Sequence, residues 1–253
     1  METKIAVIVP ARVASTRFPQ KLLHEVRGRP VILWTADRIR SEAPDYPLWF
    51  AVDNERLLHL LTEAGYQAMM TDVAHGCGTD RIAEANRTIG AEYVINVQAD
   101  EPLVTGGQIR QLADLIQGEV EMATLGTPLK HEKDYLNPNH VKCLCDARGR
   151  ALIFSRAPIP FFRDSQGLFD PARAAQLPLL IHLGLYAYRR DFLAAFAAMP
   201  PGRLEQVEKL EMLRVLEQGY RIAVGITHDA LIEIDTREQA AEFEAVVKER
   251  FPL

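Results

Sequence analysis

Strand-like and helix-like patterns alternate four times within about the first 100 residues, and this alternation constrains the fold more than any other feature. The continuous β-branched stretch from Ile5 to Val9 predicts a buried parallel strand. Further strands are predicted at 48–52, 66–70 and 92–97, and helices at 30–41, 55–64 and 80–89. Such an alternation is typical of a parallel sheet with helices on both faces. We therefore predict an α/β fold with a doubly wound, mostly parallel sheet.

In the second half of the chain, the predicted strands and helices no longer alternate regularly. Helices are predicted at 109–117, at 204–217 and from Thr236, as a cap, to about Arg250. Strands are predicted at 122–128, 140–145, 151–155, 181–188, 221–225 and 231–234. Prolines indicate a smaller, β-rich insert of loops and a hairpin at about residues 130–180. We predict a single domain over residues 1–253 that carries this insert.

Charge and hydropathy exclude several classes of protein. With 253 residues, 48% of them hydrophobic, and a net charge of −5, the chain has no overall attraction for nucleic acid or anionic lipid. No apolar run approaches the roughly 20 residues of a membrane span, and the first residues lack the apolar region of a signal peptide. We expect a cytoplasmic protein with no nucleic-acid or membrane partner.

The three cysteines, Cys77, Cys143 and Cys145, lack zinc-site spacing and are expected to be reduced thiols.

The loop after the first strand, Pro10 to Lys21, is the first segment that suggests chemistry. It lacks the glycine patterns of dinucleotide-binding dehydrogenases and of P-loop proteins. It offers three cations, Arg12, Arg17 and Lys21, and two hydroxyls. A triphosphate needs such groups because its oxygens gain charge in the transition state. The alternative is a solvated basic loop, but the position directly after a strand favours an anion site.

Two aspartates follow apolar strands and suggest a metal site. Asp100 follows the strand at 92–97, and Asp235 follows the one at 231–234. Carboxylates at the carboxyl ends of strands are well placed to hold Mg²⁺, which takes one or two of them together with phosphate oxygens and water. Asp235 alone also fits the cap of the last helix.

Polar residues in the second half of the chain suggest a substrate site, but each of them also has a purely structural interpretation. Arg156 and Arg163 fit a substrate carboxylate, or surface ion pairs that contribute little. His182 in an apolar strand fits a ligand contact or a satisfied core histidine. The acids at 205, 208 and 211 are expected to share one helix face and to contact sugar hydroxyls or water.

Six segments, taken in order, closely resemble one enzyme family over nearly the whole chain. They are Pro-Ala-Arg-x-x-Ser-Thr-Arg-x-Pro-x-Lys (10–21), His-x-x-Gly-Thr-Asp-Arg (75–81), Asn-x-Gln-x-Asp-Glu-Pro (96–102), Phe-Ser-Arg-x-x-Ile-Pro (154–160), His-Leu-Gly-x-Tyr (182–186) and Leu-Glu-x-x-Glu-x-Leu-Glu-x-Leu-Arg (204–214). The ordered set resembles the 3-deoxy-manno-octulosonate cytidylyltransferases, or CMP-KDO synthetases.

The resemblance implies a nucleotidyltransferase-type fold, a homodimer, and transfer of CMP from CTP to 3-deoxy-D-manno-octulosonate with release of pyrophosphate, for lipopolysaccharide synthesis. It implies Mg²⁺ on Asp100 and Asp235, and a catalytic set of Arg12, Lys21, Asp100 and Asp235. The residues implied to contact CTP are Pro10, Ala11, Arg12, Ser15, Arg17, Lys21, Gly78, Thr79 and Arg81. Those implied to line the sugar site are Gln98, Arg156, Arg163, His182, Tyr186 and Glu211.

The sequence departs from that family's pattern at a few positions. Gln20 and Ala99 stand where glycine is expected, Cys77 where serine is, Met212 where glutamine is, and Glu233 and Arg237 where glycine and proline are. The cations and both aspartates remain, so the reaction is expected to remain, with the octulosonate or its 8-amino analogue as the sugar.

Two alternatives stay open. One is a CMP-sialate synthetase-like enzyme, although the Phe-Ser-Arg and His-Leu-Gly-x-Tyr segments favour the octulosonate. The other is a catalytically silent nucleotide-sugar-binding protein, which would not require two metal carboxylates.

Overall fold

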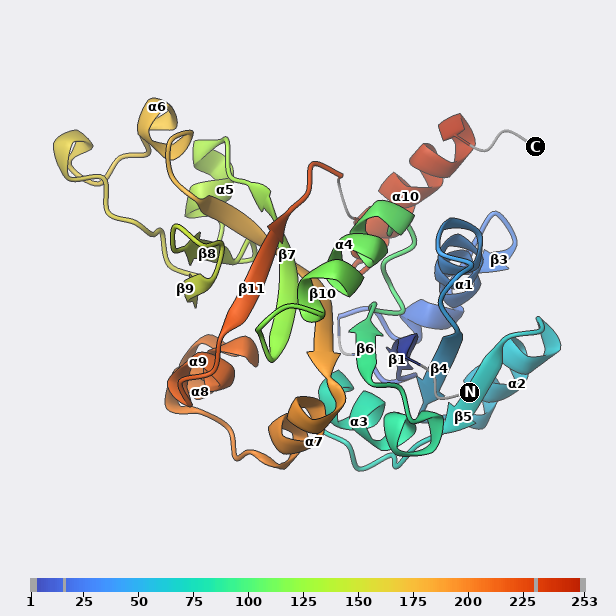
Figure 1. Ribbon diagram of the computed structural model, residues 1–253. Helices are drawn as coiled ribbons and strands as arrows, with labels where there is room; N and C mark the ends of the chain where they lie inside the picture. The colour runs from blue at the N-terminus through green and yellow to red at the C-terminus, as the bar shows by residue number, and fades with distance from the viewer. Residues whose placement is uncertain (1–3, 16, 230–231, 251–253) are drawn as a thin grey trace. The chain divides into compact units, whose positions relative to one another are not determined.

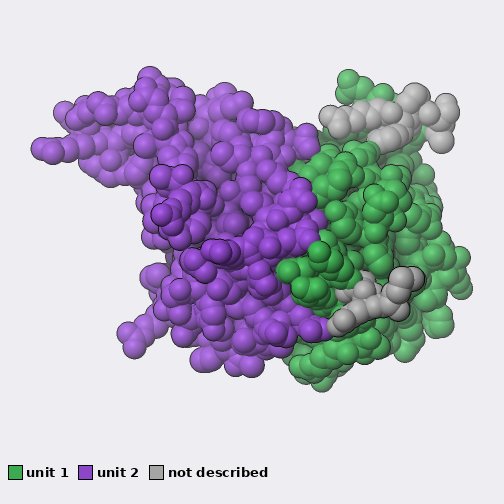
Figure 2. Space-filling view, viewed as in Figure 1, with its two compact units in different colours: residues 1–110, 230–253 green, residues 111–229 purple. Residues whose placement is uncertain are grey.

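The computed structural model describes residues 4–15, 17–229 and 232–250. Its contacts divide the chain into two compact units, coloured separately in Figure 2. Unit 1 comprises residues 1–110 and 230–253, and unit 2 comprises residues 111–229. The carboxyl-terminal segment therefore belongs to the same unit as the first half of the chain.

Unit 1 is built on four parallel strands, labelled in Figure 1: β1 (Ile5–Ala11), β4 (Leu48–Val52), β5 (Gln67–Met70) and β6 (Tyr93–Asn96). β1 lies between β4 and β6, and β5 pairs with the other edge of β4. Residues 6–9 of β1 are fully buried, as expected for a strand in the middle of a parallel sheet. All four strands were predicted from the alternating pattern, and all four are confirmed.

The helices of unit 1 follow the predicted alternation. They are α1 (Val31–Glu42), α2 (Glu55–Glu63), α3 (Gly78–Ile89) and the last helix, α10 (Arg237–Arg250). The boundary between the units falls within α4 (Gly106–Ile116). Thr236 caps α10 as predicted, because its hydroxyl accepts a hydrogen bond of 3.3 Å from the amide of Gln239. The short strands β2 (Glu25–Val26) and β3 (Arg29–Pro30) form a hairpin before α1.

Unit 2 mixes parallel and antiparallel strands: β7 (Met122–Pro128), β8 (Lys142–Cys145), β9 (Ala151–Ser155), β10 (Leu179–Arg189) and β11 (Ile222–Ile226). β7 pairs in parallel with β11 and antiparallel with β10. β10 continues antiparallel to β8, and β8 forms a hairpin with β9. Between them lie the helices α5 (Glu132–Leu136), α6 (Pro171–Ala174) and α7 (Arg190–Ala198), and the 3₁₀ turn η2 (Arg163–Ser165). None of α5, α6 and α7 is predicted from the sequence.

The helix predicted at 204–217 is wrong as a single element. The chain forms two short helices, α8 (Arg203–Glu208) and α9 (Met212–Glu217). Between them Lys209 adopts a left-handed conformation with φ of 56°, which ends α8. The acids at 205, 208 and 211 therefore do not share one helix face.

The strand predicted at 231–234 is also wrong for its described part. Leu231 lies outside the described residues, and residues 232–234 form no strand. Ile234 is fully buried, and its amide donates a hydrogen bond of 3.0 Å to the carbonyl of Asp100. In this described part of the chain, a backbone hydrogen bond and the packing of Ile234, and not a strand ladder, hold the segment.

Across the described ranges of the chain, no helix combines the length and the apolar character needed to cross a bilayer.

Candidate active site

Asp100 and Asp235 lie side by side in unit 1, although they are far apart in the sequence. Together with Glu233 they offer carboxylate oxygens within 4.8 Å of one another. The ammonium of Lys21 contacts Oδ2 of Asp100 and lies 2.5 Å from Oδ1 of Asp235. The guanidinium of Arg17 lies 2.5 Å from the other oxygen of Asp235. The structure therefore joins the cationic loop to both predicted acids in one cluster.

An apolar contact set brings these three segments together. Phe18 of the loop, Leu103 after Asp100 and Ile234 before Asp235 belong to one buried cluster. Phe243 and Val247 of α10 belong to the same cluster, so the last helix anchors the site. Burial of large side chains stabilises such a cluster by about 1.5–3 kcal/mol each. The hydrophobic residues of the loop thus fix the position of its charged ones.

The loop conformation has a feature that the sequence alone concealed. Gln20 adopts φ of 56° just before the 3₁₀ turn η1 (Lys21–Leu23), which carries Lys21. This left-handed conformation favours glycine, which explains why the resemblance leads us to expect glycine at that position. Thr16, one of the two hydroxyl residues of the loop, lies outside the described residues.

The carboxylates of the acidic cluster lie close enough to disfavour one another's ionisation. Burial and the charges of Asp100 and Asp235 raise the pKa of Glu233 to about 7. Burial, followed by the charge of Asp100, holds the pKa of Glu101 well above its usual range. Within the described part of the chain, Oε2 of Glu101 is buried without a hydrogen-bond partner. A set of hard carboxylate oxygens this close together fits Mg²⁺, which takes one or two carboxylates in proteins.

The residues expected to border the nucleotide also converge in unit 1. A methyl group on Gly78 would lie 3.2 Å from Cγ of Pro10 and 4.0 Å from Oε1 of Gln98. The start of α3 therefore packs against the end of β1 and against the segment after β6. Ala11 and Thr79 are buried beside these positions in the chain, whereas Arg12 is exposed and Ser15 half-buried.

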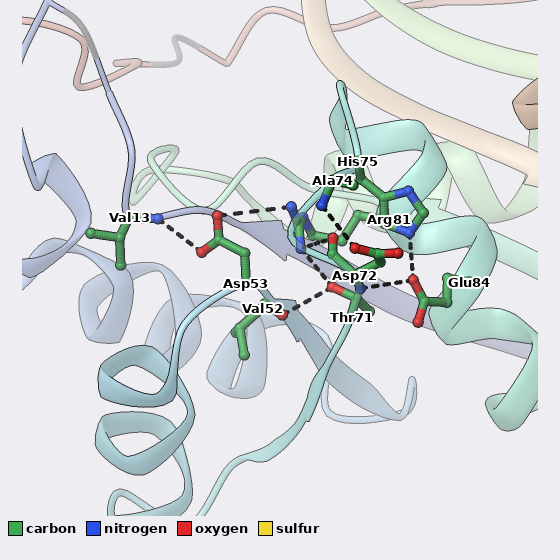
Figure 3. Close-up of polar contacts among 9 residues, drawn as sticks. All are labelled: Val13, Val52, Asp53, Thr71, Asp72, Ala74, His75, Arg81 and Glu84. Atoms are coloured by element: carbon green, nitrogen blue, oxygen red, sulfur yellow. Dashed lines mark hydrogen bonds and ion pairs between the residues drawn. The ribbon is translucent and has the colours of Figure 1, made fainter.

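Arg81, by contrast, is held by protein groups. Its side chain is only 3% exposed, and Nη1 donates to Oγ1 of Thr71 at 2.6 Å. Nη2 lies 3.8 Å from the carboxylate of Asp53 (Figure 3). A contact between Arg81 and CTP stays a prediction. The sequence reading missed Asp53, although it follows a strand just as Asp100 does.

Five of the six residues implied for the sugar belong to unit 2, and Gln98 belongs to unit 1. Arg156 follows β9 and donates hydrogen bonds to the carbonyls of Glu208, at 2.8 Å, and Pro138, at 3.0 Å. The carboxylate of Glu208 accepts from Oγ of Ser155 at 2.6 Å and from the amide of Arg156 at 2.7 Å. Glu208 thus fixes the Phe-Ser-Arg segment, a role that its sequence context did not reveal.

His182 lies beside a bulge in β10. The register with β7 shifts between Leu183 and Tyr186, and the rings of His182 and Tyr186 are 5.4 Å apart. The hydroxyl of Thr124 lies beside this bulge and donates a hydrogen bond of 2.7 Å to the carbonyl of Leu185. The same hydroxyl oxygen lies 3.0 Å from Nε2 of His182. Burial lowers the pKa of His182 to about 3, so its imidazole is neutral at physiological pH.

Arg163 and Glu211 belong to other elements of unit 2, the 3₁₀ turn η2 and the start of α9. Arg163 lines a pocket of about 520 Å³ with Phe161, Asp164 and Arg173, and the residues lining that pocket do not include His182, Tyr186 or Glu211. Glu211 lies at the start of α9, after the break at Lys209. Met212, one of the departures from the family pattern, is 4% exposed and packs into the core.

Glu205 forms a buried ion pair with Arg214, with oxygen–nitrogen distances of 2.6 and 2.8 Å. Removing one partner of such a pair leaves an unpaired buried charge, so Glu205→Ala should lower the free energy of unfolding by about 3–5 kcal/mol. Burial raises the pKa of Glu205, but the bonds from Arg214 and Gly202 outweigh it and lower the net pKa. The contribution of Glu205 should be present at pH 7 and lost as the pH falls through the folded-state pKa.

Urea unfolding at pH 7 and at a series of pH values below 4.5 would measure both effects. Glu119→Ala removes an exposed acid from the same unit and serves as the control. Equal loss for the two variants at pH 7 would contradict the assignment.

The parallel sheet of unit 1, with a cationic loop after β1 and with Asp100, after β6, beside Asp235, is of the α/β nucleotidyltransferase type. The family model described as cytidylyltransferase matches residues 6–222. A 3-deoxy-manno-octulosonate cytidylyltransferase of Xanthomonas campestris pv. campestris (strain B100) is 46% identical over 245 residues, which cover 94% of this chain and 87% of the relative. One of Geobacter metallireducens is 44% identical over 92% of this chain and 93% of its own.

Solved structures of nucleotidyltransferases also match this chain. CMP:2-keto-3-deoxy-manno-octonic acid synthetase complexed with CTP has a TM-score of 0.89 and 30% identity, covering 98% of this chain and all (100%) of that one. A putative glucose-1-phosphate thymidylyltransferase from Bacillus anthracis, with a TM-score of 0.66 and 10% identity over 97% of this chain and 96% of its own, shares the fold alone. The chain belongs to the 3-deoxy-manno-octulosonate cytidylyltransferase family. The predicted fold class and the predicted family are thus confirmed.

Proposed function

We propose that this protein transfers CMP from CTP to 3-deoxy-D-manno-octulosonate and releases pyrophosphate, for lipopolysaccharide synthesis. The observation that carries the proposal is the meeting of Lys21, Asp100 and Asp235, in a chain of this family. A charged triphosphate needs both cations for its oxygens and acids for its divalent ion.

The reaction is an in-line displacement. The anomeric hydroxyl of the sugar attacks the α-phosphorus of CTP, and an oxygen–phosphorus bond forms as the bond to the pyrophosphate oxygen breaks. The hydroxyl proton passes to solvent and pyrophosphate leaves. The ion-pair partners that the structure describes for Asp100 and Asp235 are Lys21 and Arg17, and neither is a nucleophile of the serine or cysteine type. Catalysis therefore rests on positioning and charge stabilisation.

Asp100 and Asp235 hold the magnesium ion in this proposal. When bound, Mg²⁺ neutralises phosphate oxygens and favours deprotonation of the attacking hydroxyl. Lys21, which contacts both aspartates, presents its ammonium to the same phosphates, and Arg12 adds a second cation from the exposed part of the loop. Ser15 and Arg17 complete the phosphate contacts, and Pro10, Ala11, Gly78, Thr79 and Arg81 border the nucleoside.

The residues that we assign to the sugar are, in unit 1, Gln98 and, in unit 2, Arg156, Arg163, His182, Tyr186 and Glu211. Because the imidazole of His182 is neutral, it recognises hydroxyl groups by hydrogen bonding and does not attract the sugar carboxylate. Arg156 and Arg163 bind the sugar carboxylate, because a forked guanidinium group can donate two parallel hydrogen bonds to a carboxylate. We further propose that the enzyme works in the cytoplasm as a homodimer.

Release of pyrophosphate tests the proposal directly. CTP, Mg²⁺ and 3-deoxy-D-manno-octulosonate should together give stoichiometric release, and a chelator should abolish it. Release with the 8-amino analogue only would transfer the assignment to that sugar, and release with sialate would favour the sialate branch. Binding of CTP with no release for any of these sugars would indicate a silent binding protein.

A further inference from the structure

Asp53 lies at the centre of a network that joins three strand ends of unit 1. It follows β4 directly, and its Oδ1 accepts a hydrogen bond of 3.0 Å from the amide of Val13. Val13 belongs to the cationic loop and lies next to Arg12. The other oxygen of Asp53 faces the guanidinium of Arg81 at 3.8 Å (Figure 3). One carboxylate thus touches both the loop after β1 and helix α3.

Arg81 cannot leave this arrangement without leaving charges unpaired. Besides Asp53, its guanidinium reaches Oγ1 of Thr71 at 2.6 Å and the carbonyl of Asp72 at 3.4 Å. Thr71 in turn donates to the carbonyl of Val52, the last residue of β4, at 2.9 Å. The Arg81 side chain is 3% exposed, and that of Asp53 is 16% exposed. Each group is a poor candidate for independent movement, because a buried ion that loses its partner is strongly destabilised.

The segment leading into α3 is held by a second acid. Oε2 of Glu84 accepts from the amide of Asp72 at 3.0 Å and contacts Nε2 of His75. The bond from the Asp72 amide, followed by the one to His75, lowers the pKa of Glu84. Figure 3 shows this second set adjoining the first through Asp72. The start of α3, with Gly78 against Pro10, is therefore tied to the same frame as the loop.

We propose that Asp53 is a positioning residue for CTP: it holds the backbone of the cationic loop at Val13 against the anchored guanidinium of Arg81. The inference rests on the proposed function, because it assigns the loop and α3 to one nucleotide site. Asp53 itself touches no substrate atom in this assignment. Its charge keeps Arg81 paired, and its Oδ1 sets the course of the loop that carries Arg12 and Ser15. CTP binding therefore depends on Asp53, and sugar binding does not.

Two substitutions separate the two contacts of Asp53. Asp53→Ala removes both, whereas Asp53→Asn keeps an oxygen for the Val13 amide and removes the charge. We expect Asp53→Ala to raise the KM and Kd for CTP by about tenfold or more, the loss expected when a buried charged hydrogen bond is broken. The KM for the sugar should change less than about twofold, within the effect of a distant site. Asp53→Asn should lie between Asp53→Ala and the unchanged protein.

A structural readout makes the test independent of activity. Amide hydrogen exchange of the segment around Val13 should speed up in Asp53→Ala and remain near the original rate in Asp53→Asn, because only the latter keeps an acceptor. The matched control is Asp45→Ala, which removes an exposed carboxylate near the opposite end of β4 and should alter neither exchange nor CTP binding.

Each outcome decides the inference. Equal weakening of CTP and sugar by Asp53→Ala, or unchanged CTP binding and unchanged exchange at Val13, overturns it while leaving the proposed function in place. If Asp53→Ala fails to fold, Asp53→Asn carries the same comparison, and an Asp53→Asn protein with no selective change in CTP binding also overturns it. An original protein that neither binds CTP nor releases pyrophosphate overturns the proposed function, and this inference with it.

Discussion

Asp100→Asn should lower kcat by about 10²- to 10³-fold or more, the size of effect seen when a group that stabilises transition-state charge is removed. The carboxamide has nearly the shape of the carboxylate but lacks its charge, so it binds Mg²⁺ much more weakly. The fold should survive, because the substitution relieves repulsion among Asp100, Glu233 and Asp235. Steady-state kinetics at saturating CTP and sugar, with unfolding curves for both proteins, would measure the two expectations.

Glu233→Gly is the matched control for Asp100→Asn. It also removes one carboxylate from the same cluster, but it introduces the residue expected from the family pattern. We expect its kcat to stay within about threefold of the original, since proposed metal binding rests on the two aspartates. Near-normal turnover of Asp100→Asn, or an equal loss in both variants, would remove Asp100 from its assigned role.

Lys21→Ala should lower kcat/KM for CTP by about 10²-fold or more, and should affect CTP more than the sugar. The ammonium is the one cation of the loop that contacts both aspartates, among the residues that the structure describes. Its loss removes a phosphate contact and also leaves the aspartates with less positive charge beside them. Lys248→Ala, which breaks an exposed pair with Glu244 on α10, is the control and should change little. An equal effect of Lys21→Ala on both substrates, or no effect, would contradict a phosphate-binding role for Lys21 and favour the alternative that the loop binds no anion.

The pH dependence of Lys21 has a definite sign. Burial lowers the pKa of Lys21, but attraction and hydrogen bonds from Asp100 and Asp235 outweigh it and hold the net pKa above its ordinary value. Its stabilising contribution is therefore fully present below the unfolded-state pKa and is lost only as the pH rises through the higher folded-state pKa. Lys21 should stay protonated throughout the physiological range and cause no inflection there in the pH profile of CTP binding.

Much of the fold could be predicted from local patterns. The strands of unit 1 are mostly apolar runs bounded by turn residues, and α2 and α10 begin at the side-chain caps Asn54 and Thr236. These signals act within a few residues, so a single sequence carries them. The prediction of one helix over 204–217 was wrong because contacts outside its local sequence matter there. Glu205 pairs with Arg214, Glu208 accepts a hydrogen bond from Ser155, and the helix breaks between them at Lys209.

The site divides in the same way. Strand ends on a parallel sheet share one edge, so the sequence could indicate that Asp100 would lie near the loop at Lys21. It could also name the ordered motifs that mark the family. It could not reveal that Glu233 joins the two aspartates, that Gln20 adopts a left-handed conformation, or that Asp53 links Val13 to Arg81.

The sequence by itself therefore determined the strands of unit 1 and most of its helices, the acids and cations that were candidates for the site, and the family that the chain resembles. Only the tertiary structure decided which of those side chains are paired, and with what. The reason is physical: periodicity and capping depend on neighbours along the chain, whereas the pairing of a buried charge depends on groups brought beside it by packing. Lys21, Asp100 and Asp235 meet because Phe18, Leu103 and Ile234 pack together, and no local pattern encodes that contact.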